Sequence, residues 1–244
     1  MDGLIWVLIA TAAGGVLKGA TGAGVPILGV PILTMLYDVP VAVTVFAVVN
    51  LMSNLWQGWS YRRTPLSRRF VAIFAAAGLA GTAMGTVMLA SLRPEALQLI
   101  TAGAVSTYIA FRLARPHWRL ASAAAHRLAL PVGLVAGVLQ GTTGISAPVS
   151  LSFMNAMRLD RPQFIVTISI FFAAMALVQI PMLVVYGLMT WQLAGWGVAG
   201  FAVVLAGMAL GERLVRHISA VVFDRIILAL LAVLALRLVW SALA

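Results

Sequence analysis

Long apolar stretches separated by short polar connections make up most of this chain. None of them alternates polar and apolar residues, as the strands of a membrane barrel would. Most approach the roughly 20 residues that a membrane-spanning helix requires. The pattern therefore predicts an all-α polytopic membrane protein with about eight hydrophobic segments. These segments fall at about 4–36, 41–61, 70–90, 96–111, 128–157, 164–186, 191–210 and 221–243.

Two of the segments, 4–36 and 128–157, are too long for one spanning helix and too short for two. Each contains a Gly-rich phrase, at 15–26 and at 137–148, and seven of the twelve positions are identical between the two copies. The offset of 122 residues is half of the 244-residue chain. Because glycine and proline interrupt helices, each phrase predicts a broken helix or a re-entrant turn.

This duplication predicts two membrane repeats, 1–122 and 123–244, within one integrated transmembrane domain. Cytoplasmic connections are rich in arginine, as are the connections 62–69 and 112–127. The later connections follow the same bias only if segment 128–157 enters the membrane and returns to the same side. The same reasoning places the N-terminus outside. The two halves are therefore expected to form inverted repeats.

Composition and charge narrow the function. The chain is 63% hydrophobic and 9% charged, and it has no cysteine for a thiolate metal site. Its net charge of +10 resides mostly in arginines at segment ends, where they set topology and contact lipid headgroups, so nucleic-acid binding is not expected. The six acidic residues also lie at or beside segment ends, which argues against a cation site. No cofactor or metal site is expected.

Lys18 is the only lysine in the chain and lies inside the first broken segment. An uncompensated ammonium inside a membrane is costly, so this side chain needs a partner. Two interpretations stay open. The ammonium either snorkels or pairs with a carbonyl or a distant Asp, or it binds an anion. The matching position of the second half holds Gln140, so the charge is not symmetric.

The two breaks supply further ligands for an anion. Half-helices that start near Val25–Pro26 and Ala147–Pro148 would present backbone N–H groups and partial positive charge. Breaks that face each other near the bilayer midplane would form a compact pocket for a small oxyanion. Close helix packing is the alternative for the glycines. The candidate substrate-binding residues of the two phrases are Lys18, Gly19, Thr21, Gly22, Gly24, Gln140, Gly141, Thr142, Thr143, Gly144 and Ser146.

A polar stripe runs along segment 41–61, at Asn50, Ser53, Asn54 and Gln57. Their spacing of i, i+3, i+4 and i+7 puts these side chains on one face of a helix. The stripe either lines the substrate path or bonds a neighbouring helix, and the sequence favours neither interpretation. Asn50 and Asn54 are therefore added to the candidate substrate-binding residues.

The Gly-rich phrases at 14–26 and 136–148, each followed by an Asp-x-Pro, resemble those of the sulfite exporter TauE/SafE family of membrane transporters. The length and the duplicated pattern of hydrophobic segments are also similar. The resemblance implies a small sulfur-containing or organic anion as substrate, such as sulfite or sulfoacetate, and the bacterial inner (plasma) membrane as location. It also implies that the substrate region falls on 18–24 and 140–146.

The leading hypothesis is a secondary transporter that moves a small anion by alternating access between the two halves. A passive anion channel is the alternative. An enzyme is not expected, because the spans contain no recognisable catalytic set. The expected partners are the small anion, the lipid bilayer and, for a membrane protein this small, a second copy of the chain in a homodimer.

Overall fold

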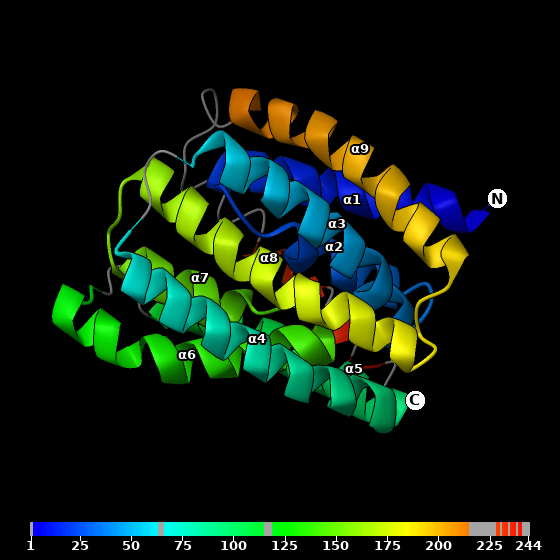
Figure 1. Cartoon of the computed structure of the whole chain (residues 1–244). Coiled ribbons are helices and arrows are strands. Elements are labelled where there is room, and N and C mark those ends of the chain that lie inside the picture. The colour runs from blue at the N-terminus through cyan, green and yellow to red at the C-terminus, as the bar shows by residue number, and fades with distance from the viewer. Residues whose placement is uncertain are drawn as a thin grey trace.

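The computed structural model describes residues 2–62, 66–114 and 119–214, together with 228–229, 231–233, 235–237 and 239–240. Residues 221–227 of the last predicted segment lie outside this description, as do parts of both Arg-rich connections. All elements in the described residues are helices, arranged as Figure 1 shows. They are α1 (Asp2–Thr21), α2 (Val25–Thr34), α3 (Val39–Ser60), α4 (Arg68–Ser91), α5 (Pro94–Ala114), α6 (Ser122–Thr143), α7 (Ala147–Ala156), α8 (Arg161–Val185) and α9 (Trp191–Leu214).

Among the described residues, six helices are long and apolar enough to cross a membrane: α1, α3, α4, α6, α8 and α9. The predicted all-α membrane architecture is thereby confirmed for this part of the chain. The predicted segment 96–111 forms α5, which is not among the six. Helices α2 and α7 have 10 residues each, so each is about 15 Å long, half of a hydrocarbon core. The count of eight hydrophobic segments stays a prediction.

Each of the two longest apolar segments folds into a long helix followed by a short one. In the first, a Cβ placed on Gly3 near the start of α1 would meet the hydroxyl of Tyr37, just beyond α2. In the second, the N–H of Leu120 before α6 donates to the carbonyl of Ala156 at the end of α7, at 2.9 Å. The start and the end of each segment therefore lie close together, so each segment turns back on itself, as the charge pattern predicts. The inverted orientation of the two halves stays a prediction.

Glycines in the left-handed region make the two breaks. Gly22 and Gly24, between α1 and α2, have φ angles of 86° and 101°. Gly144, between α6 and α7, has a φ of 72°. Residues with a side chain adopt this region only at a cost, so glycine is what permits the chain to turn here. The predicted breaks are confirmed at 22–24 and 144–146.

Other glycines hold long helices in close contact across the two halves. A Cβ on Gly15 or Gly19 of α1 would collide with the backbone of α9, and one on Gly137 or Gly141 of α6 would collide with that of α4. Small residues permit such close approach in a membrane. Figure 1 shows the result, with α9 beside α1, α4 beside α6, and α8 crossing between these pairs. The two sequence halves therefore interlock.

Two aspartates cap matching helices. The side chain of Asp38 accepts a hydrogen bond from the N–H of Val41 at 2.7 Å, at the start of α3. The side chain of Asp160 accepts one from the N–H of Gln163 at 3.2 Å, at the start of α8. Each bond satisfies an N–H of the first helical turn that has no partner within its own helix.

Candidate functional site

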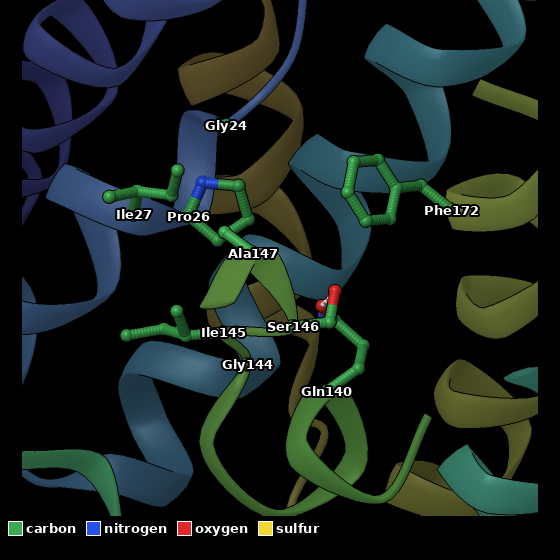
Figure 2. Close-up of a pocket in the computed structure, with 9 residues that line it drawn as sticks. All are labelled: Gly24, Pro26, Ile27, Gln140, Gly144, Ile145, Ser146, Ala147 and Phe172. Atoms are coloured by element: carbon green, nitrogen blue, oxygen red, sulfur yellow. Dashed lines mark hydrogen bonds between the residues drawn. The ribbon is translucent and has the colours of Figure 1, made fainter. Parts of the chain in front are cut away.

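The two breaks meet at a small pocket among buried residues (Figure 2). The cavity there has a volume of about 10 Å³, which is room for about one water molecule. Pro26 at the start of α2 lies beside Ala147 at the start of α7, and Phe172 of α8 lies on another side. The lining residues are Gly24, Pro26, Ile27, Gln140, Gly144, Ile145, Ser146, Ala147 and Phe172.

The N-termini of both short helices open onto this pocket. Neither Gly24 before α2 nor Ser146 before α7 caps its helix with a side-chain hydrogen bond. The hydroxyl of Ser146 instead donates to Oε1 of Gln140 at 3.1 Å. A helix N-terminus carries partial positive charge, and backbone N–H groups of the first turn point away from the helix. Two such ends at one cavity favour a negatively charged occupant.

Gln140 sits between the pocket and α8. Nε2 of Gln179 on α8 donates to the carbonyls of Gln140 at 3.3 Å and Gly141 at 3.4 Å. These two bonds fix the orientation of the amide, so Oε1 of Gln179 is the acceptor. This oxygen is buried and lacks a hydrogen-bond partner among the described residues. The second half of the site therefore carries an unused acceptor.

Lys18 lies in a separate polar cluster between α1 and α3. Its side chain is 1% exposed. Nζ donates to Oγ of Ser53 at 3.1 Å and to Oδ1 of Asn54 at 2.8 Å. Neither partner carries negative charge, and Lys18 is not among the residues that line the pocket. The predicted lysine is thus buried and bonded to the polar stripe, rather than to a backbone carbonyl or to the surface.

The family is decided by comparison. A model of the family "Sulfite exporter TauE/SafE" matches residues 7–238, nearly the whole chain. The chain belongs to the sulfite exporter TauE/SafE family. Comparison with curated proteins and with solved structures finds no match. TauE/SafE proteins are membrane transporters, which agrees with the six apolar helices and makes this chain a multi-pass membrane protein for transport.

In this TauE/SafE protein, two predicted hydroxyls shape the breaks and do not line the pocket. Thr21 Oγ1 lies 2.8 Å from the carbonyl of Leu17 and 2.7 Å from that of Ala23. Thr143 Oγ1 donates to the carbonyl of Leu139 at 2.8 Å and accepts from the N–H of Ile145 at 3.2 Å. Both threonines therefore bond to the backbone on either side of the helix end, which holds the turn in place.

Three other predicted residues lie in helix contacts. Gly19 faces the backbone of Met208 on α9, and Gly141 faces that of Thr82 on α4. Thr142 donates to the carbonyl of Gly85 on α4 at 3.2 Å. Close helix packing, the alternative interpretation of these positions, agrees with these contacts, and none of the three residues lines the pocket. Substrate contact at these three positions stays a prediction.

Of the remaining predicted residues, Gly24, Gln140, Gly144 and Ser146 are brought together at the pocket. Asn50 and Asn54 join Lys18 in the separate cluster, and Gly22 packs against Ile165 of α8. Sequence reasoning missed Phe172 and Gln179, because both lie in the apolar segment that forms α8. Gln179 could have been found from the repeat, because it lies 122 residues after Gln57 of the polar stripe.

Proposed function

We propose that this protein is a secondary transporter that moves a small anion across the bacterial inner membrane by alternating access. Sulfite, an organosulfonate or a related organic anion is the expected substrate, in keeping with the family description. The observation that carries the proposal is the pocket at which the uncapped N-termini of α2 and α7 meet. Such broken helices form the substrate sites of many secondary transporters.

The chemistry of the pocket supports an anion over a cation. No carboxylate lines it, and no cluster of acidic or histidine side chains suited to a metal ion occurs among the described residues. Nε2 of Gln140 is left as a donor, because its Oε1 accepts from Ser146. Together with those N–H groups of the two helix starts that are not already bonded, it would hold the oxyanion; Pro26 and Pro148 supply no N–H. The cavity has room for about one water molecule in this conformation, so it must widen before an anion can bind.

The arrangement of helices supports alternating access. The pocket is built from α2 and the break before it on one side, and from α6, α7 and the break between them on the other. Helices α1 and α9 pack together, as do α4 and α6. Rocking of these two groups against each other would expose the pocket to one side of the membrane at a time, as in other transporters with repeats.

Counterflow in proteoliposomes tests this proposal. Protein reconstituted with unlabelled sulfite inside should accumulate external ³⁵S-sulfite transiently, because a carrier exchanges one anion for another. A passive channel gives no such overshoot, and that result would replace the transporter with the channel. Ser146→Ala should slow exchange, because it removes a pocket hydroxyl. Ser60→Ala, at an exposed hydroxyl near the end of α3, is the matched control and should exchange at the normal rate.

A further inference from the structure

Lys18 and its neighbours form a buried cluster that the pocket does not use. Asn50 is 2% exposed, Ser53 0% and Asn54 1%, and none of them lines the pocket. All four residues come from the first half of the chain, Lys18 from α1 and the others from α3. The cluster therefore needs an explanation of its own.

The hydrogen bonds fix the orientation of both amides. Oδ1 of Asn54 accepts from Lys18, so its Nδ2 is the donor. This Nδ2 lies 2.7 Å from the carbonyl of Asn50 and 2.6 Å from its Oδ1, both acceptors. Oδ1 of Asn50 is thus occupied, and its Nδ2 is buried with no partner among the described residues. A buried N–H group without a partner is costly, so its retention calls for a reason.

The cluster has more donors than acceptors and carries a positive charge. A lysine ammonium has three N–H donors, and two of them go to Ser53 and Asn54. The third ammonium hydrogen and the Nδ2 group of Asn50 remain for a ligand. Neither α1 nor α3 places a carboxylate on Lys18. An oxyanion supplies what is missing, because it brings negative charge and several acceptors at once.

We propose that Lys18, Asn50, Ser53 and Asn54 form a second anion-binding site, distinct from the pocket at the two breaks. The site takes a sulfite, sulfonate or carboxylate group, with Lys18 as counter-charge and Nδ2 of Asn50 as a direct donor. Ser53 and Asn54 hold the ammonium while the anion is absent. Lys18 is enclosed in this conformation, so the anion reaches it when α1 and α3 move apart. The inference rests on the anion transport proposed above. It adds a site to the path of the anion at which the anion contacts the Lys18 ammonium.

The second half of the chain cannot form an equivalent site. The positions 122 residues after Asn50, Ser53 and Asn54 are Phe172, Met175 and Ala176, and Gln140 stands in place of Lys18. Phe172 lines the pocket, where it presents an aromatic ring. Of the two matching positions, only the one in the first half therefore offers an ammonium to an anion.

Two variants separate an anion site from a structural role. Asn50→Asp keeps the shape and adds a carboxylate, which would take the place of the ligand. Lys18→Gln removes the charge but keeps an amide that can bond Ser53 and Asn54. Asn155→Asp introduces the same change at an exposed residue at the end of α7 and serves as the matched control. Gln140→Leu reports on the pocket, and anion-free thermal unfolding with size exclusion shows which variants fold.

Affinity for sulfite and for sulfoacetate is then measured by titration calorimetry on purified protein at constant ionic strength. Wild type should bind two anions. Asn50→Asp and Lys18→Gln should each lose one of these binding events or weaken it at least tenfold, and Asn155→Asp should bind as wild type does. Wild-type stoichiometry and affinities in either folded cluster variant, alongside weak binding by Gln140→Leu, would overturn the second site and leave the transporter proposal standing. No binding by the wild type would overturn the anion transporter and the second site with it. If Asn50→Asp fails to fold, Lys18→Gln decides alone.

Discussion

Lys18 and Gln140 occupy the same place in the two halves of the chain, yet their surroundings differ in chemistry. Around Lys18, a buried amide nitrogen of Asn50 lacks a partner among the described residues, so this place has a donor to spare beside the lysine. Around Gln140, a buried amide oxygen of Gln179 lacks a partner in the described part of the chain, so the matching place has an acceptor to spare and an amide instead of the lysine. The sides are thus opposite in hydrogen-bonding character.

The backbone around these residues is alike where the side chains are not. Both halves contain a left-handed glycine at the break, a 10-residue helix after it, and glycines that press the preceding helix onto a partner. The two halves share the parts that set the chain path and differ in the side chains that are proposed to meet a ligand. Variants at matched positions can therefore test the scaffold and the chemistry separately.

The largest difference between the halves should follow removal of the charge. Lys18→Met should lower sulfite affinity roughly 100-fold, or about 3 kcal/mol, because a charged donor is lost. Gln140→Met at the matching position should cost less, about tenfold, since it removes a neutral group. Titration calorimetry on both variants measures the gap. Equal losses would show that the charge difference between the halves has no role in binding.

Folding of Lys18→Met needs its own control, because the lysine also bonds Ser53 and Asn54. Burying a charge without a counter-ion opposes folding, so its replacement by methionine should leave the apparent Tm unchanged or raise it. Thermal unfolding without any anion measures this. A large fall in Tm would assign the lost affinity to misfolding, and Lys18→Gln would then carry the comparison.

The next effect concerns the glycines that make the breaks. Gly22→Ala would place a Cβ 2.8 Å from Ile165, and Gly144→Ala one 3.1 Å from Val30, each at positive φ. Strain and crowding together should cost about 2–3 kcal/mol in either half and slow sulfite exchange. Gly187→Ala also has positive φ but open space around it, so it should cost only about 1 kcal/mol. Equal stability in all three variants would contradict the crowding at the breaks.

Contacts between the long helices should have an effect at least as large. Gly19→Ala and Gly141→Ala would each push a Cβ into the backbone of a partner helix, at a cost of about 3 kcal/mol or more. Gly103→Ala in α5 has nothing within 4 Å and should be neutral or slightly stabilising. Unfolding in detergent measures all three. A loss confined to one of the first two variants would show that α1–α9 and α6–α4 are not equivalent contacts.

The sequence predicted the breaks more directly than it predicted where the candidate ligand side chains lie, and the reason is physical. Gly22 and Gly144 act through their own backbone, so local sequence is enough to locate the turns. The position of Lys18 depends on its hydrogen bonds to Ser53 and Asn54 of α3, which lie more than 30 residues away, so no local pattern encodes it. Gly19 belongs to the same phrase as Gly22 and faces the backbone of α9, so its predicted contact with substrate stays a prediction. Phe172 carried no signal because an aromatic residue in an apolar helix is ordinary.

The smallest difference should be at the helix caps. Asp38→Ala removes a 2.7 Å bond at a partly buried end of α3, and Asp160→Ala removes a 3.2 Å bond at an exposed end of α8. The first should cost about 1 kcal/mol, and the second about half as much, because its bond is longer and water can replace it. Asp38→Asn and Asp160→Asn keep a capping oxygen and should retain most of the stability.

Unfolding midpoints of these four variants locate the difference between the halves. If both alanine variants lose stability and both asparagine variants keep it, the aspartates act as helix caps. The two halves then share this capping interaction as well as the breaks. Neither carboxylate belongs to the Lys18 cluster or lines the pocket, so anion affinity should not change in any of them. A fall in affinity for Asp38→Asn alone would link this charge to anion binding. The difference between the two halves in anion binding would then include the start of α3.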